Sequence, residues 1–279
     1  MKIPIPEVDE RYDCMEDALE QIISFSNIIV DKAYVIYPNS SVDDIPSYVL
    51  SFIRKILVQA TTLVKIARER NDYNTVCAIV RMLADNVATI NLVYNCKEDE
   101  EKVLRHLLYV IDGVSYRHDA LVGHPMHYDG KISQETYDEL KQQVQRAIDN
   151  TAQCISFCKK VIQVRDLYDT YKTHIDILIN NKDWKYRELG KPNLRSYTWK
   201  EMYSKLNIKT GDEMFPYLSQ YVHGLSVSNI ALGDLEDFRA PLSFAYCLIG
   251  WLLKYLLNVY EPHIGDYSKE EILKILALL

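Results

Sequence analysis

The sequence has few of the residues that interrupt helices. Its 279 residues include 9 Gly and 9 Pro, too few for an all-β fold with many tight turns. No stretch of alternating polar and apolar residues indicates a strand. Hydrophobic residues make up 48% and charged residues 25%, which is ordinary for a globular protein and excludes disordered and fibrous classes. This composition therefore favours long helices.

Several motifs that mark enzyme families are also missing. The chain has no Gly-rich phosphate loop of the Walker A or Gly-x-Gly-x-x-Gly type, so a kinase, ATPase or dinucleotide enzyme has no support. Ser219 and His223 lack a Gly-x-Ser-x-Gly elbow, which argues against a Ser-His-Asp hydrolase. No RNA-module signature is found. The formal net charge of −7 disfavours non-specific nucleic-acid binding but leaves room for a small basic site.

Signals for secretion and for zinc binding are absent as well. Residues 1–8 carry no basic-plus-apolar signal pattern, so we do not expect secretion. The 6 cysteines show no zinc-finger or zinc-ribbon spacing, and the Cys154–Cys158 pair has no third ligand nearby in the sequence. We predict reduced thiols in a cytoplasmic protein without a cofactor.

One apolar segment is long enough to cross a membrane. Residues 241–260 match the roughly 20 residues that a spanning helix needs. The segment contains Lys254, and a lysine near the centre of a bilayer costs about 3 kcal/mol. We interpret the segment as the buried central helix of a bundle and predict no membrane partner.

Helical periodicity runs through most of the chain. We expect helices at 11–34, 45–70, 72–95, 98–121 and 133–181, the last with a bend near Arg165. Capping boxes mark three further helix starts, at Thr198 with Glu201, Thr210 with Glu213, and Ser268 with Glu271. The prediction is an all-α multi-helix bundle of about seven to nine helices. It forms a single domain over residues 1–279, with any looser boundary in the loop 181–197.

One candidate site lies where the fourth expected helix ends. Six residues separate Arg117 from His124, and His118 follows Arg117 directly. On one phosphate group, an arginine can neutralise developing charge while a histidine moves a proton to or from the 2′-hydroxyl or the leaving oxygen. The pattern thus suits RNA cleavage without a metal. The alternative is a helix C-terminal cation beside a histidine in a solvated loop, and the spacing alone favours this structural interpretation.

The same segment offers ligand types for a metal ion. His118, His124 and His127 lie close in sequence to Asp119 and Asp129, and transition metals accept imidazole ligands. Catalytic zinc ligands usually belong to a rigid element, whereas a loop is expected here. We predict no metal site and keep a metal-dependent hydrolase as a third option.

A second set of polar residues is divided between two distant segments. Arg81 and Asp85 lie one turn apart on an otherwise apolar helix, and Ser219 and His223 have the same spacing far downstream, with Tyr217 beside them. If the two helices pack together, these side chains form one polar cluster, because buried charges need partners. We interpret it first as a network that fixes helix register and second as a catalytic or ligand-binding site.

The divided pattern resembles a family of all-helical bacterial proteins. The similar segments are RMLADN at 81–86, the helix expected at 199–206 and YLSQYVHG at 217–224. They resemble a domain of unknown function, family 5677, over roughly residues 45–260. That family usually has Glu where this chain has Asp85. The segment LYVIDG at 108–113, which precedes Arg117, is also similar to some of its members.

Family 5677 in turn resembles the HEPN superfamily of helical bundles. Many HEPN proteins are metal-independent ribonucleases of toxin–antitoxin and phage-defence systems, with an Arg-polar-x-His motif that acts across a dimer. For this chain the resemblance implies a HEPN-like bundle, a homodimer, an RNA substrate and a catalytic set of Arg117, His118 and His124. The chain departs from the HEPN pattern in two ways. The six-residue spacing is at the upper limit of the HEPN range, and Gly123 and Pro125 interrupt the helix that would carry the histidine.

Two functions are therefore expected. The first is a HEPN-like metal-independent ribonuclease in stress or phage defence, which requires Arg117 and His124 within reach of a common point. The second is a non-catalytic helical module that binds a protein partner or a small ligand. The acidic net charge and the lack of a strong catalytic motif favour the second.

Overall fold

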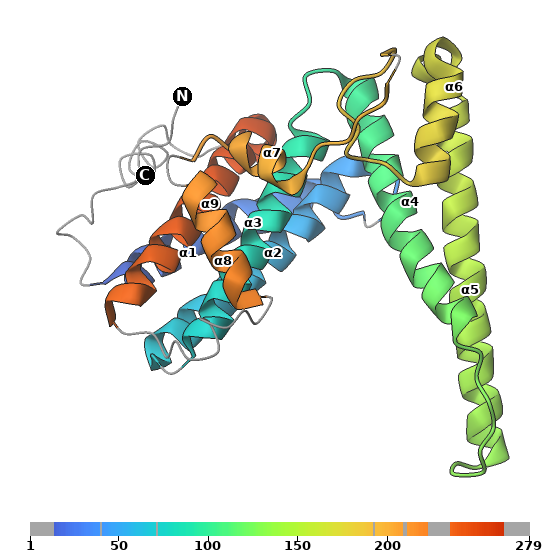
Figure 1. Cartoon of the computed structure of the whole chain (residues 1–279), viewed down its shortest axis with the longest axis horizontal. Helices are drawn as coiled ribbons and strands as arrows, with labels where there is room; N and C mark the ends of the chain where they lie inside the picture. Colours follow the sequence, from blue (N-terminus) through green and yellow to red (C-terminus); the bar gives the residue numbers. More distant parts are fainter. Residues whose placement is uncertain are drawn as a thin grey trace. The chain divides into compact units, whose positions relative to one another are not determined.

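The computed structural model describes residues 14–39, 41–70, 72–191, 193–208, 211–222 and 235–264. These residues form nine α-helices, and within these ranges the only extended pairing is an isolated antiparallel bridge between Tyr186 and Ser196 (Figure 1). The predicted all-α multi-helix bundle is confirmed. The chain forms two compact units, which are Met1–Asn91 with Thr198–Leu279, and Leu92–Tyr197. The single domain over 1–279 stays a prediction.

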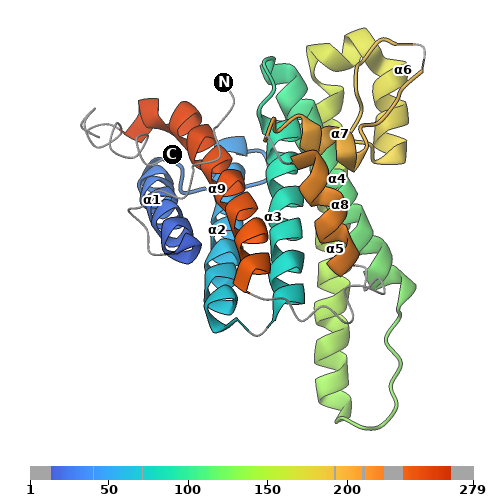
Figure 2. The ribbon, with the colours of Figure 1, turned by 60° about the vertical axis from the view of Figure 1, so that its left-hand side comes forward.

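The first unit is a bundle made from both ends of the chain. Its helices are α1 (Met15–Ile36), α2 (Ile45–Glu69), most of α3 (Tyr73–Tyr94), α7 (Trp199–Ser204), α8 (Gly211–Val222) and α9 (Leu235–Ile264). Helix α9 packs against α1, α2 and α8, and Figure 2 shows it lying across the first two. Apolar residues at helical spacing form the core, including Leu19, Ile53, Leu63, Leu83 and Leu252, all fully buried. The apolar stripe of each helix therefore has a partner.

Among the described residues, two helical segments are long and apolar enough to cross a membrane, Tyr73–Tyr94 and Phe238–Tyr260. Within the structure, 67% and 72% of their apolar windows are buried. Burial of this extent also occurs in the core helices of bundles. The predicted cytoplasmic location and the predicted lack of a membrane partner stay predictions.

The second unit is built on a long helical hairpin. Helix α4 (Asp99–Gly123) packs against α5 (Gln134–Gln163), and α6 (Asp166–Asn181) packs against both. Residues Tyr137, Thr151 and Cys158 of α5 are buried, and their spacing by multiples of seven is typical of a helix-pair seam. The bend predicted near Arg165 is a break between two helices, since Arg165 has an extended backbone with φ −96° and ψ 145°.

The loop after α6 is fixed by a buried arginine. The side chain of Arg105 is 3% exposed, and its Nη1 donates to the carbonyl oxygens of Trp184 at 3.2 Å and Tyr186 at 2.8 Å. Its guanidinium also pairs with Glu101 and lies 4.0 Å from the centre of the Tyr186 ring. Indole Nε1 of Trp184 donates to Asp112 at 3.1 Å. The first part of the predicted loop 181–197 is thus tied to α4.

Candidate functional site

Helix α4 places Arg117 and His124 on one face. Seven positions are almost two turns of an α-helix, so the two side chains leave α4 in nearly the same direction, about 10 Å apart along its axis. Both residues are exposed. Side chains as long as these can reach a group that lies between them. The two side chains therefore share the exposed face at the end of α4.

The end of α4 differs from the prediction. The helix was expected to stop near residue 121, but it continues through Gly123, and His124 is the residue that terminates it, with φ −122° and ψ 72°. A residue that precedes proline is disfavoured in the helical region because it would clash with the proline ring. Pro125 therefore ends the helix at His124, whereas Gly123 alone does not. His124 lies at a helix end and not within a free loop.

A hydrogen bond to the backbone determines which nitrogen of the His124 ring carries a proton. Nδ1 of His124 lies 3.0 Å from the carbonyl oxygen of Ala120. A carbonyl oxygen can only accept, so Nδ1 carries the proton. In the neutral ring Nε2 then has the free lone pair, and it is the nitrogen that can accept a proton or bind a ligand.

His118 faces a different direction from Arg117. Neighbouring residues on a helix are rotated by about 100°, and this rotation turns the half-buried His118 towards α5, where its Nδ1 lies 2.9 Å from Oγ1 of Thr151. The nearby carboxylate of Asp119 pairs with Lys182 at 3.1 Å. Among the described residues, Arg117 forms neither a hydrogen bond nor an ion pair. Its charge is therefore available for an anion.

The histidines of the same segment do not assemble a metal centre. In the part of the chain that the structure describes, no three His, Cys, Asp or Glu side chains come close enough to hold a metal ion. His118 turns towards α5 while His124 bonds to its own helix, so the two rings are directed apart. The geometry gives no support to a metal-dependent hydrolase built on His118, His124 and His127.

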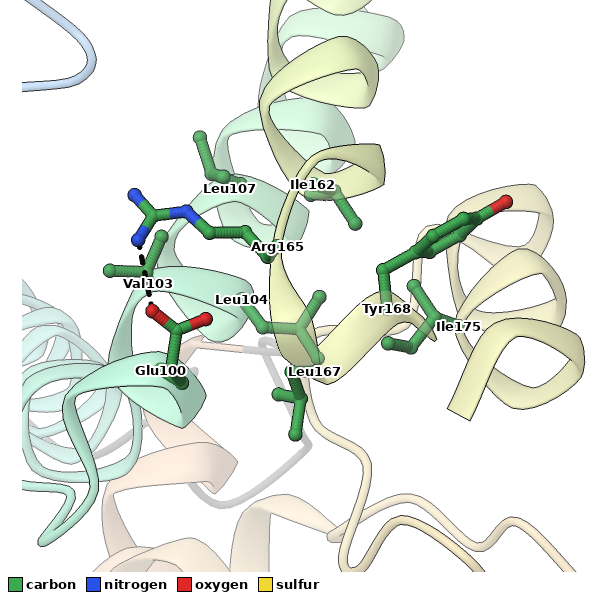
Figure 3. Close-up of a pocket in the computed structure, with 9 residues that line it drawn as sticks. All are labelled: Glu100, Val103, Leu104, Leu107, Ile162, Arg165, Leu167, Tyr168 and Ile175. Carbon is green, nitrogen blue, oxygen red and sulfur yellow. Dashed lines mark hydrogen bonds and ion pairs between the residues drawn. The ribbon is translucent and has the colours of Figure 1, made fainter. Parts of the chain in front are cut away.

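A small pocket lies at the other end of α4, between α4, α5 and α6 (Figure 3). Its polar rim is the ion pair between Glu100 and Arg165, with 3.0 Å between Oε1 and Nη1. The space holds about one water molecule. Its other lining residues are Val103, Leu104, Leu107, Ile162, Leu167, Tyr168 and Ile175. The pocket is thus a packing gap, and it is too small for a substrate.

The predicted polar cluster of the first unit forms in part. Arg81 on α3 pairs with Asp85 one turn later, and its Nε donates to Oγ of Ser219 on α8 at 3.1 Å. The side chains of Arg81 and Asp85 are 16% and 35% exposed. Ser219 Oγ also donates to the Phe215 carbonyl of its own helix, 2.9 Å away. Arg81, Asp85 and Ser219 therefore each have a hydrogen-bond partner within the cluster or its helices. His223 lies outside the described residues.

Tyr203 completes this cluster, although the sequence pattern did not single it out. Its hydroxyl donates to Asp85, and its ring lies 4.8 Å from the Arg81 guanidinium and stacks on Phe215. Burial, and then the hydrogen bond to Asp85, raise the pKa of Tyr203 above its usual value. The hydroxyl therefore stays protonated. The capping box at Thr198, which starts the short helix carrying Tyr203, is the sequence signal that could have indicated it.

Tyr217 belongs to a neighbouring set of hydroxyl groups. It bonds to Tyr73 of α3 and accepts from Tyr221 at 3.1 Å, and the rings of Tyr73 and Tyr221 pack edge to face. Burial, and then the hydrogen bond with Tyr217, raise the pKa of Tyr73. These mutually bonded groups connect α3 to α8. Their geometry favours the structural interpretation, a network that fixes helix register.

The residues singled out from the sequence thus separate into two groups. Arg117 and His118 on α4, and His124 directly after it, belong to the second unit, whereas Arg81, Asp85, Ser219 and Tyr217 lie in the first. The first group has free hydrogen-bonding atoms, whereas the second is bonded internally. Comparison with protein-family models, curated proteins and solved structures found no match to the chain.

Proposed function

We propose that the chain is a metal-independent endoribonuclease of the HEPN type, acting in stress or phage defence, with Arg117, His118 and His124 as its site. The observation that supports this proposal is the exposed face of α4. There an arginine without a described partner and a histidine whose Nε2 is free lie two turns apart. The net charge of −7 is compatible with a local site that binds a few phosphates, but not with extensive non-specific binding along a nucleic acid.

The proposed chemistry uses one guanidinium and two imidazole rings. Arg117 binds the scissile phosphate and offsets the charge that grows on its oxygens. One imidazole takes the proton of the 2′-hydroxyl, the 2′-oxygen bonds to phosphorus, and the bond to the 5′-oxygen breaks. A second imidazole, protonated at the start, gives its proton to that leaving oxygen. Because His118 and His124 of one chain are directed apart, we propose that the second imidazole comes from a second copy of the chain. The products are a 2′,3′-cyclic phosphate and a 5′-hydroxyl.

Cleavage of RNA in EDTA tests the proposal. Purified wild type is incubated with total and transfer RNA, beside Arg117→Ala, His124→Ala and, as a matched control, Arg195→Ala. Arg195 is an exposed arginine of the same unit. We expect wild type and the control to cleave, and each site variant to lose at least about a hundredfold in rate. Cleavage by both site variants at the wild-type rate would refute the site.

The second candidate function is a non-catalytic interaction module. Large apolar side chains are exposed around the end of α4, where Tyr116 is 80%, Val122 53% and Tyr128 47% exposed. Large apolar side chains exposed in this way can take part in a protein–protein contact. Wild type that cleaves none of the RNAs would favour this function, whereas repeated turnover by pure protein would exclude it.

A further inference from the structure

The hydroxyl of Thr151 determines which nitrogen of the His118 ring carries a proton. Thr151 on α5 is 8% exposed, and its Oγ1 donates to the Ile148 carbonyl at 2.7 Å. A threonine hydroxyl has one proton to donate, and the Ile148 contact uses it. Towards Nδ1 of His118, 2.9 Å away, Oγ1 can therefore only accept. Nδ1 is the protonated nitrogen of His118.

This arrangement leaves the other ring nitrogen available. Nε2 of His118 forms no hydrogen bond with any residue that the structure describes. In the neutral ring it holds the lone pair, and in the charged ring it holds the proton that can leave. The Thr151 contact is compatible with both charge states, because Nδ1 donates in each. An acid or base that must change its charge during turnover needs this property.

We infer that Thr151 is a positioning residue, which holds His118 in the Nδ1–H form so that Nε2 exchanges the proton during RNA cleavage. The inference rests on the proposed function, in which His118 is one of the two imidazoles. Thr151 is set firmly enough for this role, because it lies in the buried seam of α5 with Tyr137 and Cys158. Groups that orient a metal-ligating histidine change activity tenfold to a hundredfold, by order of magnitude, when removed, and we expect an effect of the same order for the orienting group of His118.

Two substitutions distinguish the effect of losing the Thr151 hydroxyl from the effect of changing the shape of the side chain. Thr151→Val keeps the shape and removes the acceptor, whereas Thr151→Ser keeps the hydroxyl. Thr170→Val is the matched control, because the Thr170 hydroxyl bonds only to the backbone of its own helix, at 3.1 Å from the Asp166 carbonyl. Circular dichroism establishes that each variant is folded. If Thr151→Val fails to fold, the Thr151→Ser protein and the wild-type spectrum remain as the test.

The first readout is the state of the His118 ring itself. Two-bond proton–nitrogen correlation spectra of protein labelled with ¹⁵N-histidine identify the protonated nitrogen, with His118→Gln assigning the signal. We expect the Nδ1–H form in wild type and Thr151→Ser, and a shift towards the Nε2–H form in Thr151→Val. A wild-type ring in the Nε2–H form would overturn the inference whatever the activity.

The second readout is the rate of RNA cleavage. We expect Thr151→Val to lose tenfold to a hundredfold, by order of magnitude, and Thr151→Ser and Thr170→Val to stay within about threefold of wild type. Thr151→Val cleaving at the wild-type rate would overturn the positioning role while the proposed function stands. Absence of RNA cleavage by wild type would overturn both the positioning role and the proposed function. In that case the Thr151→Ser and Thr170→Val proteins would be inactive as well.

Discussion

Arginine has two distinct roles at the residue scale in this chain. Arg105 is buried and satisfied by Glu101 and by two carbonyl oxygens. Arg117 is exposed and has no described partner. A buried guanidinium must be fully bonded because an unpaired charge is costly away from water. The same side chain type thus stabilises the fold at one position of α4 and is free to bind an anion three turns later.

Removing Arg105 is expected to destabilise the second unit. Arg105→Ala leaves the carbonyls of Trp184 and Tyr186 without their donor and exposes the Tyr186 ring. We expect a loss of about 3 kcal/mol in the free energy of unfolding, measured by urea denaturation followed by circular dichroism. The exposed Arg195→Ala is the control and should change it by less than about 0.5 kcal/mol. Equal losses in the two variants would show that Arg105 has no special role.

At the scale of elements, the short helix α7 depends on its first turn. Thr198 Oγ1 accepts from the backbone N–H of Glu201 at 3.3 Å, and the Glu201 carboxylate accepts from the backbone N–H of Thr198 at 2.8 Å. A helix of six residues has too few internal hydrogen bonds to form alone. The cap and the packing of Tyr203 against Phe215 therefore hold α7 in place.

Loss of the cap is expected to weaken α7 and, through Tyr203, the contact with Asp85. Thr198→Ala should lower the free energy of unfolding by about 1 kcal/mol. Thr198→Ser, which keeps the capping hydroxyl, should change it by a few tenths of that amount. Urea denaturation measures the stability, and hydrogen exchange of the amides of residues 199–204 measures the local effect. Unchanged exchange in Thr198→Ala would contradict the importance of the cap.

At the scale of the whole molecule, the proposed site is incomplete in one chain. Arg117 and His124 lie on the outer face of a helix, whereas a ribonuclease needs a concave site that encloses the phosphate. We expect a second copy to supply a facing wall, as in the homodimer that the family resemblance implies. Two-fold dimers are also the commonest protein oligomers.

The molar mass in solution tests this expectation. Size-exclusion chromatography with light scattering should give about twice the 32.5 kDa of one chain at the concentrations at which RNA is cleaved. Dilution should lower mass and specific activity together, because the site is then divided between separate chains. Full activity at a mass of one chain would contradict a site shared by two copies.

Much of the fold was predictable because helices begin and end for local reasons. The capping box of Thr198 with Glu201 acts within four residues, and the buried stripes of α2 and α9 repeat at helical spacing. The end of α4 was misjudged by two residues. Its true limit depends on the restriction that Pro125 imposes on His124, and glycine at 123 is tolerated within the helix.

The site was predictable only in its residue types. The sequence by itself determined that Arg81 lies one turn from Asp85, since that follows from the helix period. It did not place His124 on the same helix face as Arg117, because the helix was expected to end near residue 121, before His124. Only the tertiary structure decided that Thr151 meets His118, that Tyr203 meets Asp85 and that Arg105 meets Trp184, pairs that lie 33, 118 and 79 positions apart. Such contacts depend on how helices pack, because packing, unlike the helix period, joins residues without any fixed spacing.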